Sequence, residues 1–233
     1  MTYERRANER GAANFGWLDS RHSFSFGSYY DPKHMGFGNL RVINDDRIAP
    51  KGGFDPHGHQ NMEIISYAIE GQLAHKDSMG HEYVMGSGDV QRMSAGTGVR
   101  HSEFNPSQDN PTRFLQIWIL PDREGYPPSY EQNNFPYDSR KNQWRSIVSG
   151  SGKKGALSIN QDVEINVSLL DPSKKLNYLL EEGRSLWVQV ATGSISVNGV
   201  VYSDGDGIGF ESVGDYVFKG VEISDFIIFD LKK

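Results

Sequence analysis

Short runs of apolar and β-branched residues, separated by turn residues, recur along the whole chain. No long segment repeats its apolar residues at the helical period of about 3.6. The runs are short and end near Gly, Pro or Asp residues, which is the pattern of strands in a barrel or sandwich. The predicted strands cover residues 40–44, 62–70, 90–93, 114–120, 156–159, 163–170, 185–190, 194–197 and 226–229. We therefore predict an all-β protein.

A weak internal repeat indicates two similar units. In each half, a strong strand ends at a glycine (Gly71 and Gly193), and a later Gly-Asp turn (88–89 and 205–206) precedes another strand. Between the halves lies a polar, proline-rich stretch, which is typical of a connection. We predict an N-terminal barrel over residues 1–121, a linker or crossover over 122–145 and a C-terminal barrel over 146–233.

The composition narrows the possible chemistry. The 233-residue chain has no cysteine, which excludes disulfides, thiol catalysis and Cys-ligated metal clusters. Its formal charge of −6 argues against direct binding of nucleic acid. The charged N-terminal segment has no secretory core, and no apolar run approaches the roughly 20 residues that cross a bilayer. We expect a cytoplasmic monomer that does not bind membranes.

Two closely spaced pairs of polar residues form a candidate metal site in the first half. All seven histidines lie at or before residue 101. His57 and His59 are separated by one residue, as are His101 and Glu103, and residues i and i+2 of a strand share a face. Three nitrogens and one carboxylate suit a divalent ion such as Fe(II), Mn, Co, Ni, Cu or Zn. On an octahedral ion they leave two positions open, unlike a closed tetrahedral zinc site.

Other interpretations of the histidines stay open at this point. His57 and His59 could lie on a loop after Pro56, with the second pair forming only a mutual contact. His75 and His81 flank a predicted hairpin loop. We expect both of them to be exposed, where they could bind metal only adventitiously.

The segments around the candidate site resemble the two cupin motifs of the pirin family. Residues 52–64 (GGFDPHGHQNMEI) resemble the first motif, and residues 94–105 (SAGTGVRHSEFN) resemble the second. The resemblance covers most of residues 1–121 and is looser in the second half. Further similarity to bacterial pirins lies in NERG (8–11), WLD (17–19), FSF (24–26), YDP (30–32) and LRVINDD (40–46).

This resemblance implies a bicupin, which is two tandem jelly-roll-like β-barrels of the cupin superfamily. It implies one metal ion in the N-terminal barrel, with Fe(II) favoured, and a C-terminal barrel without His ligands. It assigns the ligands to His57, His59, His101 and Glu103. In the general cupin pattern the Glu of the first motif, here Glu63, is a ligand, but pirins do not use it. Glu63 is therefore the alternative candidate ligand, and its favoured role is to orient an imidazole N–H.

The resemblance also implies an activity. Some pirins, including bacterial ones similar to this chain, open the central ring of the flavonol quercetin with dioxygen and release carbon monoxide. The expected function is thus a metal-dependent oxidoreductase of the quercetin 2,3-dioxygenase type. Its substrates are a small phenolic compound and O₂, and Glu103 is the candidate general base. Candidates for an apolar substrate pocket, as an alternative to plain core positions, are Phe26, Phe37, Met62 and Met93.

Two other functions remain as hypotheses. Pirin relatives are also linked to transcription factors and enzyme complexes, so the chain could be a non-catalytic, redox-sensing metal protein that regulates a protein partner. Cupin sites also carry hydrolase and isomerase chemistry, because a fold does not decide a function. Only the oxygenase hypothesis requires both an accessible apolar pocket and consumption of dioxygen.

Overall fold

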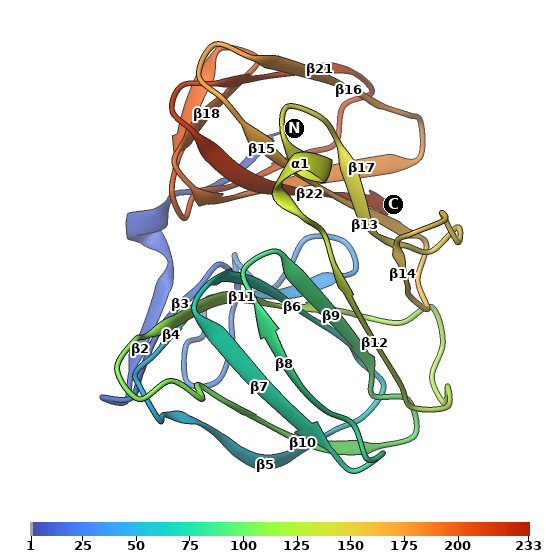
Figure 1. Cartoon of the computed structure of the whole chain (residues 1–233). Helices are drawn as coiled ribbons and strands as arrows, with labels where there is room; N and C mark the ends of the chain where they lie inside the picture. Colours follow the sequence, from blue (N-terminus) through green and yellow to red (C-terminus); the bar gives the residue numbers. More distant parts are fainter. Residues whose placement is uncertain (1) are drawn as a thin grey trace. The chain divides into compact units, whose positions relative to one another are not determined.

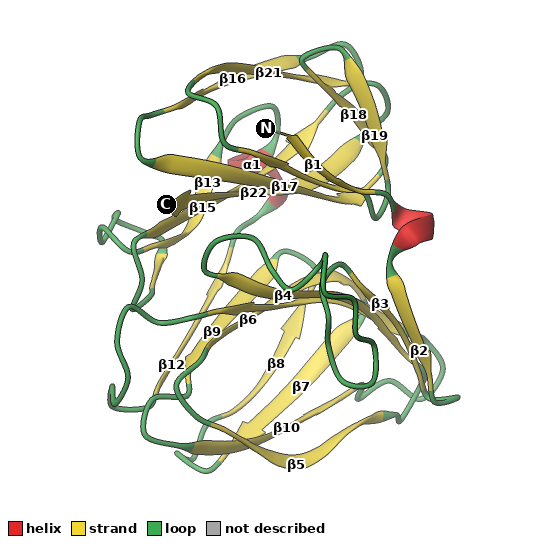
Figure 2. Ribbon diagram, turned by 180° about the vertical axis from the view of Figure 1, so that it is seen from behind, coloured by secondary structure: helices red, strands yellow, loops and turns green. Residues whose placement is uncertain are grey.

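The computed structural model describes residues 2–233 and consists almost entirely of antiparallel strands (Figures 1 and 2). Within these residues the helical elements are the short 3₁₀ turn η1 (Ala7–Glu9) and the single-turn helix α1 (Tyr137–Arg140). The all-β prediction is confirmed. No helix in this range is long and apolar enough to span a membrane.

The chain divides into two compact units. The N-terminal unit comprises Gly11–Asn134 and Leu157–Gln161, and the C-terminal unit comprises the described part of Met1–Arg10 together with Phe135–Ala156 and Asp162–Lys233. The strands of the N-terminal unit are β2 (Gly11–Asn14), β3 (Leu18–His22), β4 (Leu40–Ile48), β5 (Gly53–His59), β6 (Glu63–Glu70), β7 (Gln72–Asp77), β8 (Glu82–Gly86), β9 (Asp89–Ser94), β10 (Val99–Phe104), β11 (Thr112–Ile119), β12 (Ser129–Asn134) and β14 (Leu157–Ser158). The strands of the C-terminal unit are β1 (Thr2–Arg5), β13 (Arg145–Ser149), β15 (Val163–Leu170), β16 (Lys175–Leu180), β17 (Arg184–Thr192), β18 (Ser194–Val197), β19 (Val200–Ser203), β20 (Gly207–Phe210), β21 (Gly214–Gly220) and β22 (Ser224–Lys232).

These bounds differ from the predicted 1–121, 122–145 and 146–233 for reasons of strand pairing. β1, at the start of the chain, pairs along its length with β20 and so belongs to the C-terminal unit. β12, inside the predicted linker, pairs with β9 and extends the N-terminal unit to residue 134. Both pairings join segments that are distant in sequence, and such pairings leave no local pattern.

The N-terminal unit is a sandwich of two facing antiparallel sheets (Figure 1). The larger sheet has the order β12-β9-β6-β11-β4-β3-β2, and the smaller has the order β5-β10-β7-β8. Alternation along each strand sends every second side chain between the sheets. Apolar side chains close part of this interior, in one cluster around Phe114 and Leu73 and another around Ile64, Met93 and Val99. The remainder of the interior is polar and holds the candidate site.

The C-terminal unit has a comparable layout with an apolar interior. Its sheets have the orders β1-β20-β17-β22-β15-β13 and β16-β21-β18-β19. The core contains Val188, Phe218 and Phe226, with the half-buried Trp144 ring edge-on to both phenylalanines at 5.1 and 5.5 Å. The sequence has no histidine after residue 101, so this unit offers no imidazole to a metal ion.

Candidate metal centre

The candidate centre is built on three neighbouring strands of the smaller sheet. β10 lies between β5 and β7. His101 of β10 is aligned with His57 on one side and Asp77 on the other, while Glu103 is aligned with His75. Residues aligned across antiparallel strands point to the same face of a sheet. The register therefore gathers side chains from three strands at one place in the interior.

Three imidazoles face one another at this place. The ring centroids are 4.8 Å apart for His57 and His59, 4.5 Å for His57 and His101, and 4.9 Å for His59 and His101. One ring nitrogen from each lies within 4.8 Å of those of the other two. His101 is buried, and the other two are half-buried. This spacing allows three nitrogens to surround a single cation.

The same surroundings keep imidazoles neutral, which is the form that binds metal. Burial, reinforced by the neighbouring imidazoles, lowers the pKa of His59 to about 4 and that of His101 to about 3. His57 Nδ1 lies 2.8 Å from the carbonyl oxygen of Asp55. A carbonyl only accepts, so Nδ1–H is the donor and Nε2 of His57 carries the lone pair.

Glu103 brings a partly unsatisfied carboxylate to the interior. The residue is completely buried. Its Oε1 accepts hydrogen bonds from Ser66 Oγ at 3.2 Å and Gln91 Nε2 at 3.0 Å. Among residues 2–233, neither its Oε2 nor either ring nitrogen of His101 has a hydrogen-bond partner. Each unpaired buried polar atom costs about 1–3 kcal/mol, which a bound cation would offset. The donor set therefore fits a divalent metal ion.

The four predicted ligands, together with His75, fall into two overlapping groups. The outer donor group is His57, His59 and His101, and the inner donor group is His75, His101 and Glu103. In each group the donor atoms lie within 4.8 Å of one another. His101 belongs to both. The structure thus brings the predicted residues to one place, and the assignment of all four to one ion remains a prediction.

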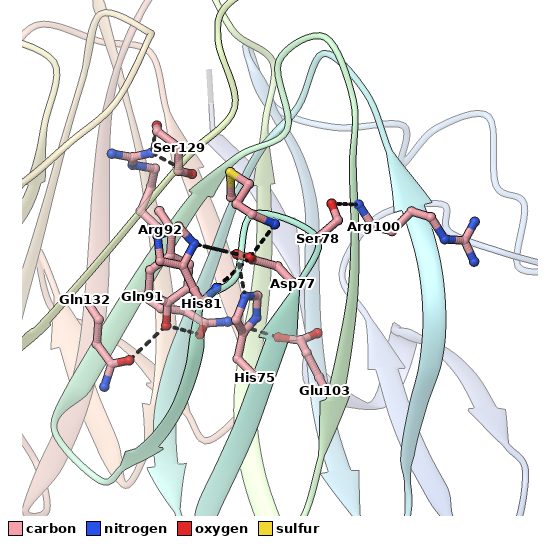
Figure 3. A network of polar contacts seen from close by, with 12 residues as sticks. His75, Asp77, Ser78, His81, Gln91, Arg92, Arg100, Glu103, Ser129 and Gln132 are labelled. Carbon is pink, nitrogen blue, oxygen red and sulfur yellow. Dashed lines mark hydrogen bonds and ion pairs between the residues drawn. The ribbon is translucent and has the colours of Figure 1, made fainter.

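The sequence alone did not identify His75 and Asp77 as residues of the candidate metal centre. The expectation that His75 is exposed is wrong: it is 1% exposed, because β7 is an inner strand of its sheet. His81 is partly exposed, and its Nδ1 lies 3.0 Å from the buried Asp77 carboxylate. Figure 3 shows this network, with His75 between Asp77 and Glu103. The i, i+2 spacing of His75 and Asp77 could have indicated that the two side chains share one face of a strand.

The structure contradicts the expectation that Glu63 orients an imidazole. Its carboxylate accepts hydrogen bonds from Ser94 Oγ at 2.7 Å and Asn160 Nδ2 at 2.9 Å. The reason is strand alternation. Ser66 on β6 bonds to the centre, so Glu63, an odd number of positions away, points to the opposite face of the sheet.

Two of the four predicted pocket residues line a cavity. Phe26 and Met62 border a pocket of about 390 Å³ together with Trp118. Phe37 and Met93 are instead buried at 8% and 1% exposure and do not line this pocket. A volume of this size is within the usual range for small-molecule sites, roughly 300–1,000 Å³.

Trp118 connects the pocket to the candidate centre. Its indole is edge-on to Phe26 at 5.3 Å and edge-on to His59 at 5.0 Å. Its Nε1 is buried without a hydrogen-bond partner in the described part of the chain. The indole therefore contacts both the cavity-lining Phe26 and the imidazole of His59.

Two family models match the chain. Residues 4–119 match the model described as Pirin, and residues 146–231 match the model described as Quercetinase C-terminal cupin domain. The chain is 43% identical, over 99% of both sequences, to a protein of Escherichia coli K12 named quercetin 2,3-dioxygenase. It is 40% identical to a pirin-like protein of Caulobacter vibrioides, covering 94% of this chain and 95% of that protein.

Solved structures show the same fold. The bacterial pirin YhhW of Escherichia coli in complex with nickel(II) matches with a TM-score of 0.95 and 41% identity, covering 100% of this chain and 99% of that one. A second structure of YhhW gives a TM-score of 0.95 at 42% identity, covering 99% and 97%. The near-complete coverage extends the likeness to both units.

Proposed function

The chain belongs to the pirin family, with two tandem cupin units, and from this membership we propose that it is a metal-dependent dioxygenase that opens the central ring of a flavonol such as quercetin. A relative that is 43% identical is named quercetin 2,3-dioxygenase, and the donor residues of this chain are gathered in its N-terminal unit. The observation that carries it is the group of buried, unpartnered donor atoms beside an aromatic pocket.

In this proposal His57, His59, His101 and Glu103 hold one divalent ion, with Fe(II) as the favoured metal. A nickel complex of a relative supports a divalent ion without fixing its identity. When bound, the ion supplies Lewis acidity that favours the deprotonated form of a substrate hydroxyl.

Glu103 is placed to accept a proton. Its Oε1 is fixed by Ser66 and Gln91, while Oε2 has no partner in residues 2–233. With Oε1 fixed in this way, Oε2 is the oxygen that would hold the ion, and it would have to swing off the ion to take the 3-hydroxyl proton of a flavonol as general base. The surrounding burial excludes bulk water, which would otherwise compete for that oxygen.

Trp118, Phe26 and Met62 receive the flat rings of the substrate. Their side chains line the pocket, and the indole of Trp118 also contacts the imidazole of His59. Binding between such side chains would orient the reacting ring toward the donor groups and so reduce the entropy cost of reaction.

The test is quercetin consumption in air by protein reconstituted separately with Fe(II), Mn, Co, Ni, Cu and Zn. We expect turnover with a particular metal and a loss of at least 100-fold in the Glu103→Gln variant, the range for removal of a general base. Glu63→Gln is the matched control, because it changes a buried carboxylate on the opposite face of the sheet. Absence of turnover with every metal, in protein that binds one ion per chain, would exclude the flavonol as substrate.

A further inference from the structure

The inner donor group contains a histidine that the proposed ligand set does not use. His75 lies on β7 directly opposite Glu103 of β10, and its ring centroid is 5.3 Å from that of His101. It is 1% exposed and stacks on Tyr130 at 4.7 Å. We propose that His75 is a metal ligand, and that His75, His101 and Glu103 form a second position for the ion of the N-terminal unit. This inference rests on the metal-binding part of the proposed function.

The hydrogen bonds of His75 leave one nitrogen available. Nε2 lies 3.2 Å from Asp77 Oδ2. Asp77 also accepts hydrogen bonds from the backbone N–H of Met79 at 2.9 Å and of His81 at 3.1 Å. An ionised carboxylate only accepts, so Nε2–H donates and Nδ1 carries the lone pair.

A histidine held in this way resembles the metal ligands of known sites. Ligating histidines generally donate the second ring N–H to a carboxylate or a carbonyl, which fixes the tautomer and the ring orientation. His57 has such a partner in the Asp55 carbonyl, and His75 has one in Asp77. In both residues, a hydrogen bond from one ring nitrogen to an oxygen leaves the other ring nitrogen available for a metal ion.

The atoms of the inner donor group are buried and unpaired. His75 Nδ1, both ring nitrogens of His101 and Glu103 Oε2 have no hydrogen-bond partner within the described residues. One donor atom from each residue lies within 4.8 Å of those of the others. Three residues that are less than 3% exposed, and that each carry an unpaired nitrogen or carboxylate oxygen, offer the donor chemistry of a cation site.

The two donor groups are alternatives for one ion. A neutral imidazole has a single nitrogen lone pair, so His101 serves one ion at a time. The outer group adjoins the pocket through the contact of His59 with Trp118, whereas the inner group adjoins Tyr130 through His75. The ion can thus be retained by the inner group when the outer histidines are lost.

The experiment measures Zn²⁺ binding in the full chain. The His57→Ala/His59→Ala double variant removes two of the three outer donors. We expect it to bind one Zn²⁺ per chain more weakly than the wild type. Adding His75→Phe should weaken binding at least tenfold further, and adding His81→Phe should change it less than about twofold. The second addition is the matched control, because His81 also bonds to Asp77 but lies outside both donor groups.

A folded double variant that binds no Zn²⁺ would overturn the inference, and so would equal affinities with and without His75. If His75→Phe prevents folding, ¹⁵N NMR of the histidine rings in the double variant can show whether His75 binds Zn²⁺. A shift of the His75 Nδ1 resonance on adding Zn²⁺ supports the inner position, and an unchanged resonance overturns it. Failure of the flavonol proposal appears separately, as metal binding by the wild type without quercetin turnover. Wild type that binds no Zn²⁺ overturns both.

Discussion

The rings of His59 and Trp118 meet edge to face with their centroids 5.0 Å apart, although they come from opposite sheets of the N-terminal unit. One ring belongs to the outer donor group and the other borders the pocket of about 390 Å³. A ligand in the pocket would therefore touch a side chain that is in contact with a candidate metal ligand.

The first prediction concerns this contact. Trp118→Phe keeps a ring but a smaller one, which weakens the contacts with Phe26 and His59, and we expect kcat/KM for quercetin to fall about tenfold, equivalent to about 1.4 kcal/mol. Trp118→Leu removes the ring as well and should cost more. Metal content, measured by elemental analysis, should stay at the wild-type level in both variants. Unchanged kcat/KM in the leucine variant would contradict the role given to the indole.

The second prediction concerns stability and the ion. A ligand that binds only the folded state stabilises it by about 2.7 kcal/mol when its free concentration is about 100 times Kd. Adding Ni²⁺ or Zn²⁺ should raise the Tm of the N-terminal unit by several degrees, and a chelator should reverse the rise. His101→Ala should abolish the rise, because His101 belongs to both donor groups. His34→Ala, outside both groups, should retain it, as calorimetry can show.

The third prediction concerns the pH dependence of stability through Asp46. Burial, aided by the charges of Asp45 and Glu103, raises the pKa of Asp46 to about 7 despite a hydrogen bond from Ser20. Between about pH 4 and pH 7 the folded state therefore holds a proton that the unfolded state releases. The Asp46 contribution should reduce stability as pH rises across this window and remain constant above it.

Asp46→Asn tests this sign. Relative to the wild type, the variant should gain more free energy of unfolding at pH 8 than at pH 5, by on the order of 3 kcal/mol. Urea denaturation at the two pH values measures the difference. Asp109→Asn, at an exposed position, is the control and should show no pH-dependent gain. Equal gains at both pH values for Asp46→Asn would refute the raised pKa.

The fourth prediction compares two ion pairs. Arg113 donates from Nε and Nη2 to Asp45 at 2.8 Å each, and both side chains are buried. Arg113→Met removes the buried guanidinium and leaves Asp45 with the exposed Arg47 at 3.8 Å, which should cost about 3–5 kcal/mol in the free energy of unfolding. Lys76→Met breaks an exposed pair with Glu82 and should cost less than about 1 kcal/mol. Similar costs for the two variants in urea denaturation would contradict this ranking.

Much of the candidate centre could be predicted because strand alternation is a local property. The i, i+2 spacing placed His57 with His59, and His101 with Glu103, without knowledge of the sheet order. His75 could not be placed in the same way. Its proximity to Glu103 depends on β7 being the neighbour of β10, which only the folded sheet shows.

The same limit explains the error at Glu63 and the shifted boundaries. The face to which Glu63 points depends on which residues of β6 turn inward, and a fully buried strand does not reveal this by its composition. β1 pairs with β20, which lies about 200 residues later in the chain. The strand character of β1 therefore depends on the complete fold and not on its own sequence. Local patterns predicted elements, and distant pairings decided their partners.

The allocation of segments to units also bears on how the protein is made. Asn160 bonds to Glu63, and Ser158 bonds to Arg92 and Glu131, so the N-terminal unit draws on residues that follow β13 of the other unit. A ribosome that has synthesised residue 134 has not yet supplied them, and β1 must wait for β20 before it can pair. Neither unit is therefore one continuous segment that could be expressed alone with all of its residues. During translation, each unit can finish folding only after residues outside its main segment have been synthesised.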